Sequence, residues 1–163
     1  MSDSAPRRAL PSLLFIVCLL FLDRITKQAA LAYLKGRPAF AVIPEIIEFT
    51  YVENTGAAFG MLKGMGPLFF VLAAAVSVFL FRCILIVPRK KRYLPARICY
   101  AFIISGAIGN LIDRAYYGYV IDFIYFKPIN FPVFNVADIY ISCSSILLCI
   151  LICFYYKDED RLF

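Results

Sequence analysis

The sequence predicts an all-α membrane protein with a small β element, built from four transmembrane helices and a small extracytoplasmic β-sheet. The 163 residues are 63% hydrophobic and only 17% charged, far from the balance of a soluble domain. The apolar residues are gathered in long runs, and shorter stretches between them alternate as strands do. We expect a single integral membrane domain over 1–163. Its predicted spans are about 10–30, 67–87, 94–113 and 137–156, and its extracytoplasmic β region covers about 40–66 and 115–135.

The first apolar run follows a basic start and is almost wholly apolar until Asp23. Together with the small residues at 30–32 it also fits a cleavable signal peptide, but charged residues lie between the apolar core and those small residues, so we favour a retained span. A helix over 10–27 rises about 27 Å, which places Asp23 and Lys27 near the outer interface on one helix face. The pair either merely ends the span or braces a site at that surface.

The region after the first run alternates in polarity, which predicts a strand. Ile47, Phe49 and Tyr51 would share one face. Glu48, Thr50 and Val52 would share the other. The turn-forming residues at 54–56 would be followed by a returning strand at 57–62, and the apolar, β-branched residues 119–125 read as a further extended segment.

Basic residues set the predicted orientation. Arg7 and Arg8 precede the first run, and a cluster of four Lys and Arg residues at 89–92 follows the second. Such clusters are retained in the cytoplasm, so we expect cytoplasmic N- and C-termini and an outward-facing sheet.

The last two helices carry polar residues at their outer ends. Gly106 and Gly109 would permit close approach of a neighbouring helix. Asp113 and Arg114 would end the third helix as a charge pair. Asn135 is a candidate N-cap of the last helix, with Asp138 at the third position in an arrangement like a capping box.

Composition excludes several kinds of chemistry. The net charge of +6 comes from clusters beside apolar runs, which points to membrane orientation rather than nucleic acid, so we expect no nucleic-acid partner. The six cysteines lie inside apolar runs and read as core or lipid-facing residues. Histidine is absent, so histidine-based triads and histidine-ligated metals are excluded; we expect no metal and no cofactor. Aspartate is the main acid–base group that remains.

The predicted topology brings the polar residues of different segments to one outer surface. Two carboxylates that lie close together share a proton and can act as acid and base together, as in aspartic proteolysis. The same cluster could bind a cation or relay protons in a small transport protein, or simply cap helices in a structural scaffold. The residues alone leave these readings open. The residues concerned are Asp23, Lys27, Asn54, Asn110, Asp113, Arg114, Asp122, Asn135 and Asp138.

Motifs in order along nearly the whole chain resemble the lipoprotein signal peptidase (signal peptidase II) family of bacteria. Together they are far more specific than any one alone. They are Asp23 with Lys27, NTGAAF at 54–59, GAIGNLIDR at 106–114, VIDF at 120–123 and FPVFNVAD at 131–138.

The resemblance implies an intramembrane aspartyl endopeptidase of the bacterial cytoplasmic membrane. It would cut diacylglyceryl-modified prolipoproteins just before the lipidated cysteine, and its expected inhibitor is the cyclic peptide globomycin. Asp122 and Asp138 would be catalytic. The enzyme would be surrounded by membrane lipids, and we expect it to be a monomer. The supporting or substrate-binding residues implied are Asp23, Lys27, Asn54, Gly56, Asn110, Asp113, Arg114 and Asn135.

The sequence departs from the family pattern in two places. Ser105 stands where a further glycine is usual, and the connection between the two implied catalytic aspartates is compact at 127–130. Neither departure removes a polar site residue. We also expect Tyr51, Phe59 and the aromatics around Asp122 to form a lid that limits water at the site.

Overall fold

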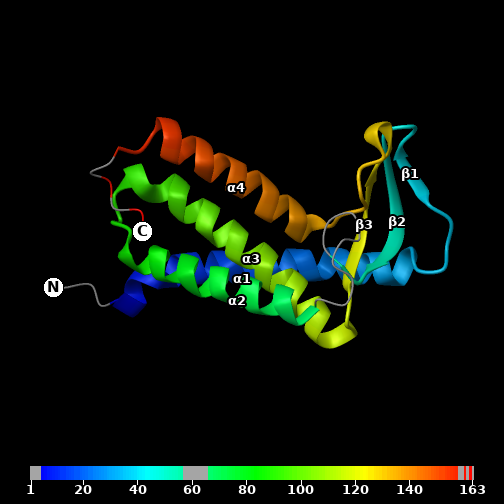
Figure 1. The fold of residues 1–163 in the computed structure, drawn as a ribbon, viewed down its shortest axis with the longest axis horizontal. Helices are drawn as coiled ribbons and strands as arrows, with labels where there is room; N and C mark the ends of the chain where they lie inside the picture. Colours follow the sequence, from blue (N-terminus) through cyan, green and yellow to red (C-terminus); the bar gives the residue numbers. More distant parts are fainter. Residues whose placement is uncertain (1–4, 57–65, 158–159, 161, 163) are drawn as a thin grey trace.

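The computed structural model describes residues 5–56, 66–157, 160 and 162, and consists mainly of four helices with a three-stranded sheet at one end (Figure 1). The sheet lies at the opposite end of the molecule from the start of α1 and the end of α4. This arrangement confirms a mostly helical protein with a small β element. The helices are α1 (Ala5–Tyr33), α2 (Gly66–Ile86), α3 (Leu94–Tyr117) and α4 (Val136–Phe154).

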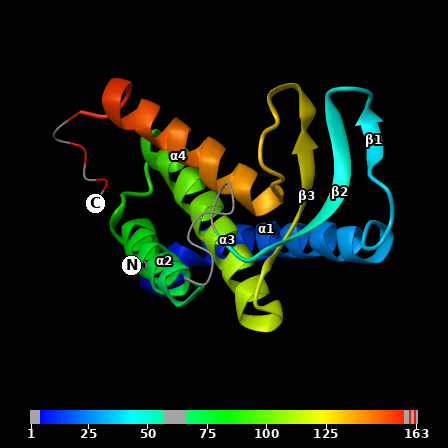
Figure 2. The same ribbon diagram turned by 45° about the vertical axis from the view of Figure 1, so that its right-hand side comes forward.

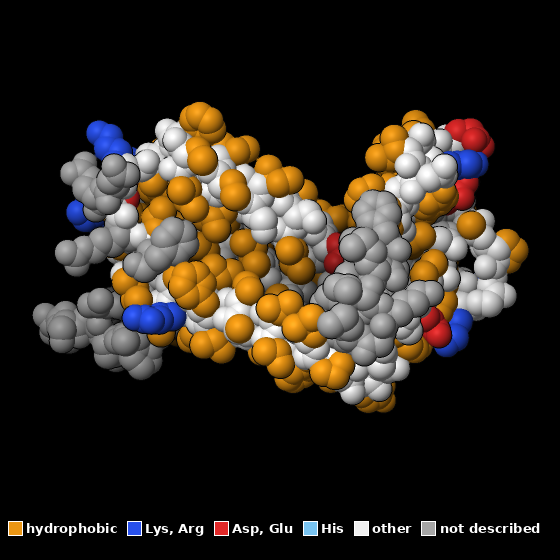
Figure 3. Space-filling model, in the orientation of Figure 1, with side chains coloured by type: hydrophobic (Ala, Val, Ile, Leu, Met, Phe, Trp, Pro, Cys, Tyr) orange, Lys and Arg blue, Asp and Glu red, His pale blue; other side chains and the backbone are white. Residues whose placement is uncertain are grey.

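The helical body presents apolar side chains to its surroundings. Figure 3 shows them covering the length of the helices, with Lys and Arg gathered at the two ends. Val78 is 71% exposed and Ile146 is 62% exposed, which lipid explains better than water does. Within the described residues, 91–117 and Val136–Phe154 are long and apolar enough to cross a membrane, and Phe70–Ile86 is a shorter apolar helix. The count of four spans stays a prediction.

Helix α1 is longer than its predicted span. It continues through Asp23 and Lys27 to Tyr33, so the charge pair does not end the helix. The two side chains are fully or almost fully buried and form an ion pair of 3.0 Å. Because each charge finds partners inside the protein, no break in the helix is needed to bring it to water.

Helix α3 packs against the other three helices, and Figure 2 shows it between α1 and α4. A Cβ atom added at Gly106 would collide with the Ala137 carbonyl oxygen of α4, and one added at Gly109 would lie 2.5 Å from the Asp23 carboxylate of α1. The predicted close approach at both glycines is therefore confirmed. The absence of a Cβ allows α4 and α1 to approach α3 near its outer end.

The sheet consists of β1 (Phe40–Ile43), β2 (Ile47–Asn54) and β3 (Val120–Phe126), paired antiparallel with β2 in the centre. The strands predicted at 47–52 and 119–125 are confirmed to within one or two residues. The pairing of β2 with β3 changes register between Phe49 and Val52. The returning strand expected at 57–62 lies outside the described residues.

The sheet is attached to the helices by a hydrophobic cluster of its own. Ala30 of α1 packs with Ile121 and Phe123 of β3, and all three are buried. A larger cluster joins the helices nearer the other end, around Tyr100 of α3. The smaller cluster fixes β3 against α1, so the residue between Ile121 and Phe123 faces away from α1.

Candidate active site

The polar residues that the sequence predicted to share one surface form a connected hydrogen-bond network where the helices meet the sheet. They come from α1, β2 and the turn after it, α3, β3 and the first turn of α4. Every member of this set makes at least one contact with another. The members are Asp23, Lys27, Asn54, Gly56, Asn110, Asp113, Arg114, Asp122, Asn135 and Asp138.

Asn135 lies at the centre of the network. Its side-chain amide donates to Asp122 Oδ1 at 2.6 Å and to Asn110 Oδ1 at 3.1 Å. Its side-chain oxygen accepts from Asp138 N at 3.0 Å, and its backbone N–H donates to Asp138 Oδ2 at 3.1 Å. The predicted capping box at the start of α4 is thus confirmed. One residue therefore holds both candidate carboxylates.

Asp122 is buried on β3, where it lies in sequence between the apolar residues Ile121 and Phe123. Its Oδ2 accepts a hydrogen bond from the Asn54 amide at 2.8 Å, while Oδ1 accepts from Asn135. Burial, and secondly the charge of nearby Asp138, raise the pKa of Asp122 to about 7, although the two amide donors oppose the shift. A carboxyl with this pKa can hold or release a proton near neutral pH.

Asp138 is fixed by the first turn of α4. Its Oδ1 accepts from the Asn110 amide of α3 at 2.8 Å, and its Oδ2 accepts from the backbone N–H of Asn135. Because α3 approaches α4 closely at Gly106, Asn110, one turn further along α3, reaches the start of α4. The carboxylate is therefore held at two points by different elements.

Both carboxylates line one cavity of about 190 Å³. Asn110 and Arg114 contribute polar groups from α3, and Asn54 contributes one from β2. The segment between β3 and α4 supplies a mostly apolar wall, and Ser142 lies one turn beyond Asp138 on α4. The lining comprises Asn54, Asn110, Arg114, Val120, Asp122, Phe131, Pro132, Val133, Phe134, Asp138 and Ser142.

A buried cation supports this cavity from α1. Lys27 is fully buried and forms ion pairs with Asp23 at 3.0 Å and with Asp113 at 3.1 Å. It also donates to Asn110 Oδ1 at 2.8 Å, so the Asn110 amide group is oriented with its nitrogen toward Asp138. Buried charges need such pairing, and here the pairing also orients a residue that contacts a candidate carboxylate.

The partners of Asp113 and Arg114 differ from the expected simple pair at the end of α3. Asp113 forms a 2.6 Å ion pair with Arg24 of α1 and accepts from the backbone N–H of Ile121 at 3.2 Å, in addition to its pair with Lys27. Arg114 donates to the Gly56 carbonyl at 3.0 Å. Helix α3 also continues beyond both residues to Tyr117. Asp113 therefore joins α1 to β3, while Arg114 reaches the turn after β2.

The turn after β2 is closed by a side chain. Asn54 Oδ1 accepts from the backbone N–H of Gly56 at 2.9 Å, while its amide nitrogen contacts Asp122. The turn predicted from 54–56 thus positions the Asn54 amide. Of the expected lid residues, Phe59 lies outside the described residues. The Tyr51 hydroxyl contacts Glu53 at 3.2 Å and Tyr119 at 3.4 Å, away from the residues that line the cavity.

Sequence reasoning did not assign Arg24 or Ser142 to the site, and it identified 131–134 as part of a family motif without placing these residues in the cavity wall. Arg24 lies about one helical turn before Lys27 on α1, and its contact with Asp113 depends on the packing of α1 against α3, which the sequence does not specify. Ser142 follows Asp138 by four residues, and this i,i+4 spacing was a signal available in the sequence. Among the described residues, no three His, Cys, Asp or Glu side chains are grouped as a metal ion would require.

Comparisons with known proteins match most of the chain to one family of proteins. Residues 15–154 match the family model described as signal peptidase (SPase) II. The chain is 40% identical over 152 residues to the lipoprotein signal peptidase of Clostridium tetani, covering 91% of this chain and 96% of that protein. It is 42% identical over 138 residues to the lipoprotein signal peptidase of Caldanaerobacter subterraneus, covering 84% and 92%.

Solved structures show the same fold. One bacterial membrane enzyme, determined by the in meso method at 2.3 Å resolution, superposes with a TM-score of 0.79 at 29% identity, covering 92% of this chain and 93% of that chain. A second, determined at 1.9 Å resolution, gives a TM-score of 0.77 at 30% identity, with coverages of 90% and 94%.

Proposed function

The chain belongs to the signal peptidase II family, and we propose that it is an intramembrane aspartyl endopeptidase with Asp122 and Asp138 as its catalytic pair. Its substrates are prolipoproteins from which it removes the signal peptide. The cut falls just before a cysteine that carries a diacylglyceryl group. The observation that carries the proposal is the cavity lined by both carboxylates, which are held jointly by Asn135.

The two carboxyl groups have different roles in hydrolysis. One accepts a proton from the attacking water, and the other, which carries a proton, donates to the carbonyl oxygen of the scissile amide. The proton taken from water then passes to the leaving nitrogen. The pKa of Asp122, raised to about 7 by burial and by Asp138, suits such transfers near neutral pH. The cavity volume of about 190 Å³ has room for the water and the reacting amide.

The amides around the pair keep the carboxylates in place during these transfers. Asn54 and Asn135 donate to Asp122, while Asn110 donates to Asp138. None of the three amides gains or loses a proton at neutral pH, so they orient the carboxylates without competing for the transferred proton. Lys27 orients Asn110 in turn and is a positioning residue.

The apolar wall and the surrounding helices suit a substrate with a lipid anchor. Phe131, Val133 and Phe134 face the cavity beside Asp138. The acyl chains of the substrate remain in the bilayer while its backbone enters the polar cavity. In this arrangement globomycin, a cyclic peptide, competes for the same cavity, and one chain is sufficient for activity.

The proposed orientation places this cavity on the outer side of the bacterial cytoplasmic membrane. Both termini are cytoplasmic, together with the basic residues at 89–92. The support comes from β2, β3 and the start of α4, which carry lining residues of the cavity and lie at the end of the molecule remote from 89–92 (Figure 1).

The test is cleavage of a purified lipidated precursor, followed by gel shift. Asp122→Asn and Asp138→Asn each remove a carboxyl group at nearly constant size, and each is expected to lower the cleavage rate by at least about a hundredfold. Thermal unfolding in detergent and membrane insertion serve as folding controls. Cleavage by both folded variants at the rate of the unchanged protein would exclude the dyad and favour an ion- or proton-coupled transport role for the same aspartates.

A second arm tests the lipid-anchored substrate. The same assay with an unlipidated precursor of identical sequence is expected to show much slower cleavage. Equal rates would show that the acyl chains contribute nothing to docking, although the dyad itself would stand.

A further inference from the structure

A second cavity lies at the end of the molecule remote from the candidate active site. It has a volume of about 510 Å³ and is formed between the start of α1, the start of α3 and the loop that precedes α3. None of its lining residues lines the cavity of the two aspartates. The lining comprises Pro11, Ser12, Phe15, Arg89, Leu94, Arg97, Ile98 and Ala101.

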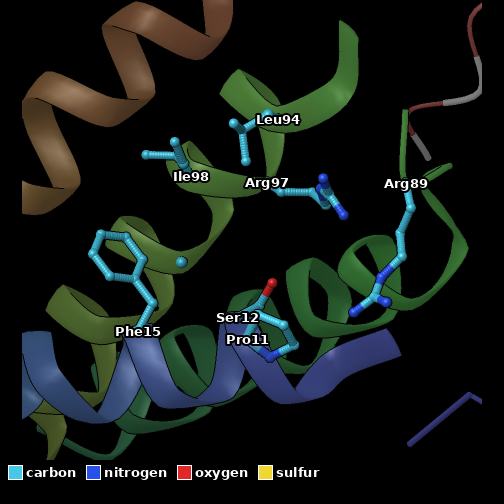
Figure 4. A pocket seen from close by; sticks show the side chains of 8 residues that line it. Pro11, Ser12, Phe15, Arg89, Leu94, Arg97 and Ile98 are labelled. Carbon is cyan, nitrogen blue, oxygen red and sulfur yellow. The ribbon is translucent and has the colours of Figure 1, made fainter. Parts of the chain in front are cut away.

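Two guanidinium groups contribute the polar part of this cavity. Figure 4 shows Arg89 and Arg97 extending toward the same space from different segments, with the Ser12 hydroxyl pointing into it from α1. The positive charges of Arg89 and Arg97 are close enough to repel one another. Arg97 Nε is in addition buried without a hydrogen-bond partner among the described residues. An anion bound between the two guanidinium groups would offset their repulsion and could accept a hydrogen bond from Arg97 Nε.

The remainder of the cavity is apolar and open to the side of the helical body. Phe15 of α1 is 37% exposed, and Leu94 and Ile98 of α3 are 48% and 37% exposed. In Figure 4 Phe15 and Ile98 lie at the end of the cavity away from Arg89. These side chains belong to helices whose exposed faces are apolar, so a ligand that fits here has both an anionic and a hydrocarbon part.

We propose that this cavity binds an anionic phospholipid of the leaflet at this end of the molecule, with its phosphate between Arg89 and Arg97. One acyl chain lies along Phe15 and Ile98. Basic pockets between membrane helices at the cytoplasmic side recognise lipid headgroups by this combination of charges and apolar walls. Arginine suits the phosphate because its planar guanidinium can donate two parallel hydrogen bonds. The proposal is independent of the catalytic role of Asp122 and Asp138.

The proposal is tested by native mass spectrometry of the full-length, delipidated protein in detergent. Phosphatidylglycerol is the probe, phosphatidylcholine has a headgroup without net charge, and glycerol 1-phosphate is a soluble phosphate without acyl chains. We expect phosphatidylglycerol to bind about tenfold more tightly than phosphatidylcholine and the soluble phosphate to bind far more weakly. Equal binding of the two lipids would overturn the proposal. Tight binding of glycerol 1-phosphate would overturn the lipid as occupant in favour of a small anion.

Variants locate the binding. The double change Arg89→Gln with Arg97→Gln is expected to reduce binding of phosphatidylglycerol about tenfold. The matched control is Lys90→Gln with Lys91→Gln, which removes the same charge from exposed neighbours outside the cavity lining. Equal losses in both double variants would show a diffuse charge effect and overturn the site.

A third variant tests the apolar half without altering charge. Ile98→Trp fills the cavity and is expected to weaken binding of phosphatidylglycerol while leaving both arginines in place. Unchanged binding would place the lipid elsewhere. Size-exclusion elution and thermal unfolding verify that each variant is folded, and precursor cleavage is expected to persist in all three, because their changed residues are remote from Asp122 and Asp138.

Discussion

Asn135 contacts the two candidate carboxylates through different atoms, so its structural and catalytic contributions can be separated. The side-chain oxygen caps α4, and the side-chain nitrogen donates to Asp122. Serine is about as good an N-cap as asparagine but has no amide nitrogen to place at 2.6 Å from Asp122.

Asn135→Ser is therefore expected to leave the free energy of unfolding nearly unchanged while it lowers the cleavage rate. Asn135→Ala removes both contributions and is expected to lower stability by about 1 kcal/mol as well. Thermal or denaturant unfolding in detergent measures the stability of each variant, and the precursor gel shift measures its cleavage rate. If Asn135→Ser cleaved the precursor at the full rate, the hydrogen bond from the Asn135 amide to Asp122 would have no role in catalysis.

The pKa of Asp122 predicts a pH dependence of stability. Because the folded protein raises this pKa to about 7, mainly through burial, the folded state holds the proton more tightly than the unfolded chain does. The resulting stabilisation is complete below the ordinary carboxyl pKa and is lost as pH rises through about 7. Relative to Asp122→Asn, the unchanged protein is expected to lose stability as the pH rises from about 4 to about 7.

Thermal unfolding of both proteins over a pH series checks this expectation. The difference between their melting temperatures should change in that interval, and the cleavage rate should fall on its alkaline side as Asp122 loses its proton. Parallel melting profiles would show that Asp122 does not titrate there.

The residue contacts divide sharply into those that the sequence could predict and those that it could not. The capping box of Asn135 and Asp138 was readable because the two residues are three positions apart and the pattern is local. The contacts of Arg24 with Asp113 and of Asn54 with Asp122 join residues far apart in the chain. They depend on helix packing and strand register, which local patterns do not specify.

At the scale of elements, the contact between α3 and α4 leaves no space for an added side-chain atom at Gly106. A Cβ at Gly106 would meet the backbone of α4 at Ala137, and backbone cannot rotate away as a side chain can. Gly106→Ala is expected to destabilise the protein by about 1–3 kcal/mol and to lower the cleavage rate, because α4 carries Asp138.

The control for that substitution is Ala115→Val, which adds more volume at an exposed position of the same helix. It is expected to change stability by less than about 0.5 kcal/mol. Unfolding in detergent measures both variants, and equal effects would mean that the contact of α3 with α4 is looser than the structure shows.

The helices illustrate how far hydrophobic runs predict element bounds. The predicted last span of about 137–156 agrees well with α4 at Val136–Phe154, because a capping box precedes a continuous apolar run there. Helix α1 extends to Tyr33, three residues beyond the predicted span of about 10–30. Asp23 and Lys27 lie inside this helix because they pair with each other and, through Lys27, with Asp113 of α3. The apolar run alone does not predict this tertiary pairing.

For the whole molecule, the predicted orientation can be tested by labelling. Lys90 and Glu45 are both exposed but lie at opposite ends, in the basic segment before α3 and between β1 and β2. In intact cells a membrane-impermeant maleimide is expected to label Glu45→Cys and not Lys90→Cys.

Permeabilised cells provide the control, because both positions should then react. The native cysteines lie in the helices, and the unchanged protein gives the background labelling. Labelling of Lys90→Cys alone in intact cells would reverse the proposed topology.

The fold class was predictable from the sequence because each kind of element has its own pattern. Helices in lipid need long runs of apolar residues, and strands of a sheet with one buried face alternate apolar and polar residues. The gathering of the polar residues at one end followed from span lengths and charge bias. Their individual partners did not follow, as Asp113 shows: its neighbour Arg114 was the obvious partner, yet Lys27 and Arg24 of α1 form its ion pairs.

The strand order has a consequence for the nascent chain. Strand β2 ends at Asn54, but its partner β3, which carries Asp122, follows only after α2 and α3 have been synthesised, and Asp138 comes later still. A ribosome-bound chain that ends before α4 therefore lacks one of the two carboxylates of the proposed catalytic pair. Under the proposed function, the growing polypeptide is inactive until its final helix has been synthesised.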